Sequence, residues 1–204
     1  MGRTLYLMRH GETVFNVQER IQGWVDSPLT EHGIEQARAA GRLLAERGVV
    51  FDHAYCSTAE RASDTLELVL EAMGQPLPYE RMKALREHYH GTLEAESERL
   101  NRDVSMDEMD AFYRHFGGET TEDTRSRVVP ALLDIMERPE HENVLVVSHA
   151  GACMISLTAF GFEEQVMAGG AGNGTVWVLD YLGPAADPTD PVDSFALREI
   201  IPGK

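Results

Sequence analysis

The chain has 204 residues, of which 43% are hydrophobic and 25% charged, so we expect one folded domain over residues 1–204 with a substantial core. The formal net charge of −16 argues against nucleic acid and anionic membrane surfaces as partners, although a local group of cations can still hold a small anion. The sequence has neither a leader pattern nor an apolar run of membrane-spanning length, which predicts a cytoplasmic protein.

The first predicted element is a buried strand in a short apolar run at residues 4–8. Arg9, His10 and Gly11 follow it directly, where the strand leaves the sheet. In an open α/β sheet, ligands bind at the carboxyl ends of the strands, so this junction is expected at the mouth of a crevice. Arginine offers a fork of donors suited to phosphate, and a neutral imidazole can act as a base, a metal ligand or a nucleophile. A polar loop is predicted over residues 14–29.

A crossover helix is predicted next, with Thr30 as its N-cap and Gly48 at its end, because apolar residues recur between them at helical spacing. Residues 49–56 predict a second strand. Ser57 and Glu60 then form a capping-box pattern for another helix.

Arg61 lies in the first turn of that helix. The free N–H groups and the positive end of the helix dipole lie there, so Arg61 would add charge to an existing anion site. The helix is predicted to end near Gly74.

The segment 79–118 has broken periodicity and predicts a helical insertion lying over the sheet edge. A helix is expected at residues 122–137, followed by the most strand-like run of the chain at 143–148. That strand also ends in a histidine, His149, which precedes an apolar helix reaching Gly161.

A glycine-rich loop at residues 169–174 separates this helix from two final strands, at 175–182 and 195–201. Strands that alternate with crossover helices predict a three-layer α/β/α sandwich, with a mostly parallel central sheet, helices on both faces and antiparallel pairing possible at the end. The sequence carries no signal for an oligomeric state.

Three of the predicted strand ends or strand-to-helix junctions carry groups that are or can become cationic: Arg9 with His10, Arg61, and His149. In a parallel sheet these junctions share one edge, so the four side chains are expected to meet in one cleft. Two arginines and two histidines form, in outline, a pocket for a phosphoryl group.

Four blocks of sequence, in this order, resemble the histidine phosphatase superfamily in its phosphoglycerate-mutase-like branch. The blocks are residues 7–13 with Asn16, residues 57–62 with Thr65, residues 85–87 with Gly91, and residues 147–151. One such block would be a weak signal, whereas four at compatible spacings are a strong one, and together they cover nearly the whole chain.

The resemblance implies a role for each matching residue. It makes His10 the nucleophile that accepts a phosphoryl group and Glu87 the proton donor. It also implies a group of phosphate-holding and substrate-binding positions, namely Arg9, Arg61, His149, Asn16, Gln22, Gly23 and Ala150. Fixed cationic donors can stabilise the charge of phosphoryl transfer, so neither a metal nor a cofactor is expected. Because nearby cations oppose an acid role, Glu87 is expected to be partly desolvated or to face the substrate.

The sequence departs from the family pattern in three places. Cys153 and Met154 stand where many relatives have an arginine shortly after the glycine that follows the second histidine, and Ala95 stands where a glycine is usual. Mutases of the family also carry extra basic residues and a longer insertion. Arg99, Arg102 and Arg114 could partly supply that charge, but the short insertion is more typical of the phosphatases.

We therefore expect a metal-independent phosphomonoesterase that works through a phosphohistidine on His10 and takes a small phosphorylated substrate, releasing inorganic phosphate. One alternative is a 2,3-bisphosphoglycerate-dependent phosphoglycerate mutase, and another is a phospho-ligand binding protein without turnover. A third possibility is a metal site formed by His88, His90 and Glu87, since histidine and carboxylate close in sequence suit zinc.

Overall fold

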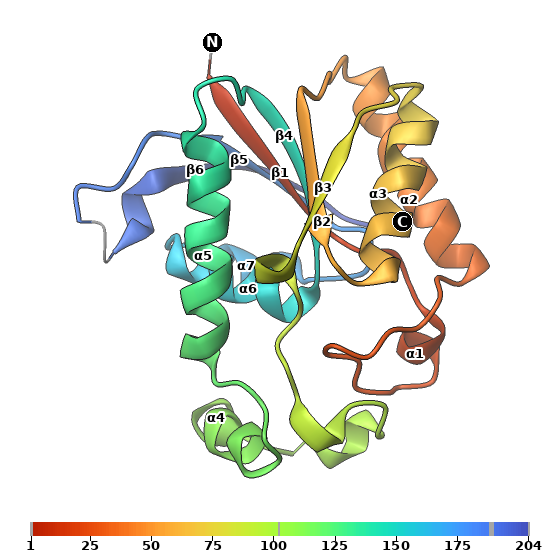
Figure 1. Ribbon diagram of the computed structural model, residues 1–204, viewed down its shortest axis with the longest axis vertical. Coiled ribbons are helices and arrows are strands. Elements are labelled where there is room, and N and C mark those ends of the chain that lie inside the picture. The colour runs from red at the N-terminus through yellow and green to blue at the C-terminus, as the bar shows by residue number, and fades with distance from the viewer. Residues whose placement is uncertain (1, 102, 188–189, 204) are drawn as a thin grey trace.

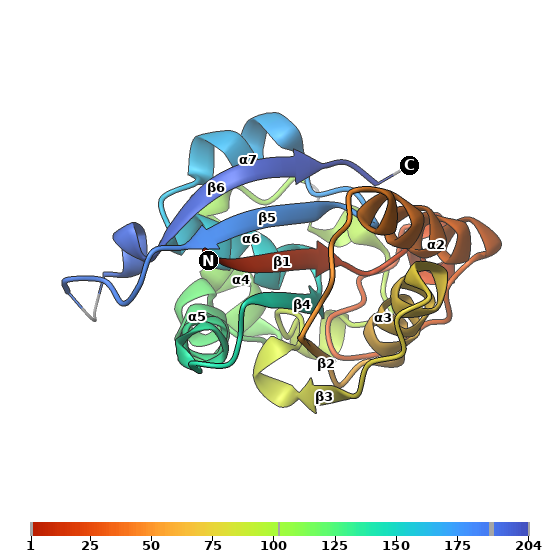
Figure 2. The same ribbon diagram turned by 90° about the horizontal axis from the view of Figure 1, so that it is seen from above.

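The computed structural model describes residues 2–101, 103–187 and 190–203. Its centre is a six-stranded sheet in the order β3-β2-β4-β1-β5-β6 (Figure 2). The strands are β1 (Arg3–Arg9), β2 (His53–Ser57), β3 (Tyr79–Met82), β4 (Asn143–Ser148), β5 (Val176–Tyr181) and β6 (Phe195–Ile201). Strands β3, β2, β4 and β1 pair in parallel, whereas β5 is antiparallel to both β1 and β6. The mostly parallel sheet with an antiparallel end is as the sequence predicts.

Helices cover both faces of the sheet and form three layers (Figure 1). On one face, α2 (Glu31–Glu46) and α3 (Glu60–Met73) pack residues such as Leu44 and Leu66 against Met8 and Val147. On the other face lie α5 (Thr121–Glu137), α6 (Ala150–Ala159) and α7 (Glu163–Gly169). Successive strand residues point to opposite faces, so β1 and β4 feed both cores. The three-layer α/β/α prediction is confirmed.

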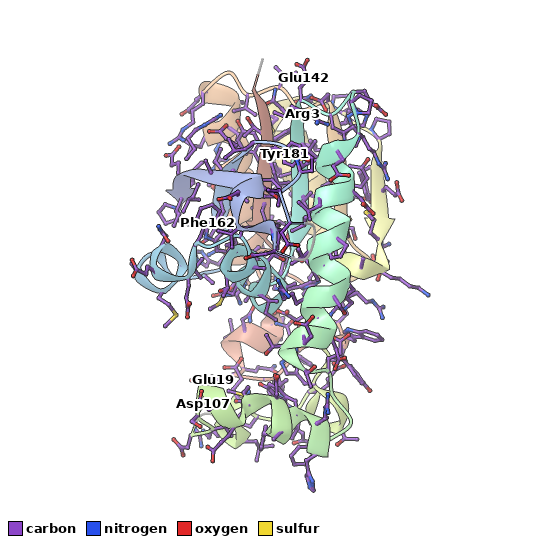
Figure 3. The ribbon with its side chains drawn as sticks, turned by 90° about the vertical axis from the view of Figure 1, so that its left-hand side faces the viewer. Arg3, Glu19, Asp107, Glu142, Phe162 and Tyr181 are labelled. Atoms are coloured by element: carbon purple, nitrogen blue, oxygen red, sulfur yellow. The ribbon has the colours of Figure 1, made fainter. Side chains whose placement is uncertain are left out.

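The helical segments of the loop after β1 and of the insertion lie beyond the carboxyl ends of the parallel strands (Figure 1). Helix α1 (Val14–Val17) lies in the loop after β1, and α4 (Met106–His115) follows three short 3-10 turns, Lys83–Leu85, Gly91–Leu93 and Glu98–Leu100. A further 3-10 turn, Pro191–Ser194, precedes β6. Figure 3 shows Arg3 and Glu142 at one end of the molecule, with Glu19 and Asp107 at the opposite end near α4. Both the loop after β1 and the insertion therefore border the edge where the strands end.

Several local predictions are wrong. The second strand is shorter than residues 49–56, because the ladder begins at His53. Helix α3 has Ala59 as its N-cap without a side-chain bond, and Ser57 Oγ instead accepts a hydrogen bond from the Ala59 N–H at 3.3 Å. The predicted Ser57 capping box is therefore absent. Residues 79–82 are the edge strand β3 rather than helix.

Within the described parts of the chain, no helix is both long enough and apolar enough to cross a membrane.

Candidate active site

The two histidine-bearing junctions are neighbours because β1 and β4 are adjacent parallel strands in register, with Arg9 opposite Ser148. His10 and His149 each follow the last residue of their strand. Their ring centroids lie 5.2 Å apart, and the planes meet at 65°. Both side chains are almost fully buried. The sheet topology thus brings together two imidazoles that are separated by most of the chain.

The hydrogen bonds of His10 fix its tautomer. Its Nδ1 lies 2.7 Å from the Gly11 carbonyl oxygen, which can only accept, so Nδ1 carries the proton and Nε2 presents a lone pair. Arg61 Nε donates to that lone pair at 3.3 Å. Burial, followed by the charges of Arg61 and Arg9, holds the pKa of His10 well below its usual 6.5. His10 is therefore a neutral imidazole whose free nitrogen faces an arginine.

Gly11 is required by close packing of the backbone. A Cβ atom at this position would lie 2.4 Å from the Gly33 carbonyl oxygen of α2. The Gly11 N–H donates to Thr65 Oγ1 at 3.0 Å, and that hydroxyl donates to the Arg61 carbonyl at 2.7 Å. Contacts with α2 and α3 therefore fix the position of the backbone that orients His10.

Arg61 is buried on α3 and is held by the loop that follows α1. Its Nη2 donates to the Gly23 carbonyl at 2.8 Å, and its Nη1 donates to the Val25 carbonyl at 2.9 Å and to Asp26 Oδ1 at 3.0 Å. Asp26 also accepts from the Glu60 N–H in the first turn of α3. The guanidinium is thus fixed with its Nε directed at His10.

Arg9 and His149 supply further polar groups beside His10. The Arg9 guanidinium donates to the Ala171 carbonyl, and its buried Nε has no partner within the described residues. Burial lowers the pKa of Arg9, against the opposing charge of Glu87. Both ring nitrogens of His149 are likewise buried and unpartnered among the residues that the structure describes. Burial and then the charge of Arg61 hold the pKa of His149 well below 6.5.

Glu87 caps the first turn of α6, which begins directly after His149. Its Oε2 accepts from the Gly151 N–H at 3.0 Å, and its Oε1 accepts from the N–H groups of Ala152 at 2.9 Å and His88 at 2.8 Å. The positive end of the helix dipole favours negative charge at this place. The residue is half-buried, in agreement with the partial desolvation expected for it.

The four predicted substrate-binding residues surround this cluster. Asn16 Oδ1 accepts from Thr13 in a capping box on α1, and Ala150 is the first residue of α6. Gln22 is buried, and its Oε1 has no partner in the described parts of the chain. Gly23 has a φ of +57° and contacts Arg61 through its carbonyl oxygen. Asn16 and Gly23 thus connect to the cluster through Asn173 and Arg61, and Ala150 directly follows His149.

Three residues that support the site were not predicted. Arg127 of α5 donates to the carbonyl oxygens of residues 84, 86 and 87 and pairs with Glu119 at 2.7 Å. Asn173 Nδ2 lies 3.1–3.3 Å from the carbonyl oxygens of residues 10 and 11 and from Asn16 Oδ1. Glu94 accepts from the N–H groups of residues 24 and 25 at 2.6 and 2.8 Å. Of these three residues, only Asn173 stands out in the sequence, as a single asparagine within a glycine-rich loop.

The possible metal site is not supported by the side-chain geometry. His88 Nδ1 is bonded to Thr124 Oγ1 at 2.8 Å, and the Glu87 carboxyl faces α6. Among the described residues, no group of three or more His, Cys, Asp or Glu side chains is arranged to hold a metal ion.

The departures from the family pattern have structural counterparts. Ala95 adopts a φ of +68°, the left-handed conformation in which glycine is usual. Met154 is half-buried on α6. Arg99 and Arg114 are exposed, and Arg102 lies outside the described residues.

The fold and the site define an α/β protein with a cluster of histidine and arginine side chains at the carboxyl edge of its sheet. A profile of the Histidine phosphatase superfamily (branch 1) matches residues 5–183, and the chain belongs to this family.

Named relatives include both mutases and phosphatases. A 2,3-bisphosphoglycerate-dependent phosphoglycerate mutase of Rhizobium etli (strain CIAT 652) is 39% identical over 165 residues, which is 74% of this chain and 76% of the relative. The crystal structure of a phosphoglycerate mutase from Bacillus anthracis str. Sterne has a TM-score of 0.77 and 28% identity, with coverage of 96% and 91%. The alpha-ribazole phosphatase of Shigella flexneri has a TM-score of 0.71 and 30% identity, with coverage of 87% and 90%.

Proposed function

We propose that this protein is a phosphomonoesterase that hydrolyses small phosphate monoesters through a phosphohistidine on His10 and needs no metal for the transfer. The observation that carries the proposal is the orientation of His10. Its Nδ1 is bound to the Gly11 carbonyl, and its Nε2 lone pair lies 3.3 Å from Arg61 Nε in a fully buried setting. A neutral, fixed imidazole beside cationic donors is the arrangement that nucleophilic attack on phosphorus requires.

In the first step, His10 Nε2 attacks phosphorus, and the bond from phosphorus to the alcohol oxygen breaks. Bonding of Nε2 to phosphorus uses the lone pair that Arg61 Nε contacts, which frees this N–H to bind a phosphoryl oxygen. Arg9 and His149, next to His10, carry buried nitrogens without a partner among the described residues, and these bind the other oxygens. These donors are already in place, so little reorganisation is needed as charge develops.

Glu87 gives its proton to the departing alcohol oxygen. We assign this transfer to Oε2, because Oε2 accepts one N–H whereas Oε1 accepts two. In the second step, Glu87 takes a proton from water, the water oxygen attacks phosphorus, and the bond to His10 breaks. Inorganic phosphate leaves, and His10 and Glu87 return to their starting states.

The second candidate is the 2,3-bisphosphoglycerate-dependent mutase, which the names of the curated relatives favour. It would use the same His10 chemistry but return the phosphoryl group to a phosphoglycerate. Such a substrate adds a carboxylate, and a bisphosphate adds a second phosphate, so both call for further cations. Arg99 and Arg114 are exposed, and the Arg86 guanidinium is bonded to Thr58 and stacked on Trp24. This arrangement favours the phosphatase.

Phosphate release from phenyl phosphate and 3-phosphoglycerate, measured with EDTA present, tests the proposal. We expect release that resists EDTA, is abolished by His10→Ala and is retained by His115→Ala, a matched change at an exposed histidine of α4. Isomerisation of 3-phosphoglycerate after addition of a bisphosphate, without phosphate release, would establish the mutase. Binding of phosphate esters with neither activity would indicate a binding protein. Release that survives His10→Ala would contradict both enzyme proposals.

A further inference from the structure

A groove with a volume of about 730 Å³ lies between α4, the start of α5, α6 and α7. We call it the α6 groove, because it follows one face of α6 from Gly151 to Ala159. Its volume falls within the range of sites that bind small molecules. The apolar side chains that line it include Met109, Met154, Ile155, Val166, Met167 and Val192.

Helix α6 is apolar on two faces although only one is covered by the core. Cys153 and Leu157 are buried against the sheet. Met154, which also packs against the edge of the core, and Ile155 line the groove and are only half-buried. No residue of α6 is charged. Met167, which also lines the groove, is 74% exposed. Apart from the exposed Thr158, the groove face of α6 is apolar and suited to an apolar ligand.

The groove begins at the residues that hold the proposed proton donor. Gly151 lines the groove, and its N–H donates to Glu87 Oε2 at 3.0 Å. His88 and His90 line the same end, and the His88 N–H donates to Glu87 Oε1. An alcohol oxygen that takes a proton from Glu87 therefore lies near the start of the groove, and the carbon atoms attached to it can follow α6.

The charges around the groove disfavour an anionic alcohol. Asp110, Glu163 and Asp190 line it, whereas Arg125 is the one arginine or lysine among its described lining residues and pairs with Glu122 at 3.5 Å. Burial lowers the pKa of His90 to about 4 and also lowers that of His88, so both imidazoles are neutral near pH 7. A carboxylate or second phosphate on the alcohol would therefore meet more negative than positive charge.

We propose that the α6 groove binds the alcohol portion of the substrate and that the preferred esters are phosphates of uncharged, apolar alcohols. This inference rests on the proposed phosphatase function and names its substrate class. Hydrolysis of phosphates of short polar or anionic alcohols, such as 3-phosphoglycerate, is correspondingly slow.

The test is kcat/KM for phosphate release from ethyl, butyl and hexyl phosphate. These esters have nearly the same leaving-group chemistry and differ in apolar length. A fully buried methylene is worth roughly a fourfold gain, so between ethyl and hexyl phosphate we expect an increase of about tenfold or more even with partial burial. Met154→Gln and Ile155→Gln place an amide in the groove and are expected to reduce the ratio of hexyl to ethyl rates at least about threefold.

Leu182→Gln is the matched control, since Leu182 is 65% exposed and lies outside the groove. We expect this variant to have the same ratio of kcat/KM for hexyl phosphate to kcat/KM for ethyl phosphate as the unmodified protein. A ratio near one in the unmodified protein, or an unchanged ratio in both groove variants, would overturn the inference while leaving the phosphatase intact.

Calorimetric binding of ethyl and hexyl phosphate to the His10→Ala protein separates the two proposals. Tighter binding of hexyl phosphate, weakened by Met154→Gln, supports the groove even if turnover is absent and the proposed function fails. Equal affinity for the two esters would overturn the groove assignment.

Discussion

Gly151→Ala is expected to impair the proton transfer of Glu87 without harming the fold. A Cβ atom at Gly151 would lie 2.6 Å from Glu87 Oε1, whereas an ordinary contact needs about 3.5 Å, so the carboxyl must retreat by roughly 1 Å. Alanine also favours the helix over glycine by up to about 1 kcal/mol, which limits any loss of stability. A displacement of roughly 1 Å at a reacting group can lower the rate by on the order of a hundredfold.

The assay compares phenyl phosphate with p-nitrophenyl phosphate, which are similar in shape but differ in how strongly the leaving oxygen needs a proton. We expect Gly151→Ala to reduce kcat for phenyl phosphate by about 10-fold to 100-fold and that for p-nitrophenyl phosphate much less. Glu87→Gln should show the same selectivity. The double variant should be no slower than Glu87→Gln alone, because the two changes act on one group.

Equal losses for the two esters in Gly151→Ala would show that the substitution does not act through proton transfer. Additive losses in the double variant would refute the positioning of Glu87 by Gly151. Denaturant unfolding of each variant is the control for the fold, and the free energy of unfolding of Gly151→Ala is expected to change by less than about 1 kcal/mol.

Three further predictions concern the supporting structure. Arg127→Met removes the donor to three carbonyl groups around Glu87 and leaves Glu119 without its arginine partner. Denaturant unfolding should therefore show a free energy of unfolding lower by about 2 kcal/mol. An unchanged free energy of unfolding would contradict the supporting role of Arg127. His90 has a pKa of about 4 in the folded protein against 6.5 ordinarily, so its contribution to stability is complete above pH 6.5 and is lost as the pH falls towards 4. That loss is about 3 kcal/mol. His90→Gln should therefore flatten the dependence of the free energy of unfolding on pH between about pH 4 and 6.5. An unchanged dependence would show that His90 does not have a lowered pKa. Gly11→Ala brings a Cβ atom to 2.4 Å from the Gly33 carbonyl oxygen, so it should lower both thermal stability and phosphate release, and an active, fully stable variant would contradict this.

The fold could be predicted where the sequence pattern matched the burial. The run that became β4 is buried over five of its six residues, and its neighbour β1 is similarly apolar. Strand β3 could not be predicted, because it lies at the sheet edge and its central residues, Glu80 and Arg81, are exposed. Its pattern resembles a surface loop, and only pairing with β2 makes it a strand.

The meeting of His10 and His149 could be predicted from topology, because parallel strands bring their carboxyl ends to one edge. The capping of α6 by Glu87 could not be predicted. Glu87 lies in a loop of irregular structure, and the N–H groups that it accepts from belong to Gly151 and Ala152, which are 64 and 65 positions further along the chain. Asn173 contacts residues more than 150 positions earlier in the chain, and its place in a glycine-rich loop marks the residue but not these partners. Local patterns do not report such contacts, and the supporting residues of a site are therefore the part that sequence predicts least well.

The central claim is that His10 carries the phosphoryl group during turnover. Rapid mixing of the protein with phenyl phosphate, followed by an alkaline quench and peptide mass analysis, tests it most directly, because phosphohistidine survives base. We predict a phosphoryl adduct on the peptide that contains His10, with slower decay in Glu87→Gln because the water attack has lost its base, and no adduct in His10→Ala. Turnover of the ester with no adduct on His10 at any mixing time, or an adduct on another residue, would contradict the account.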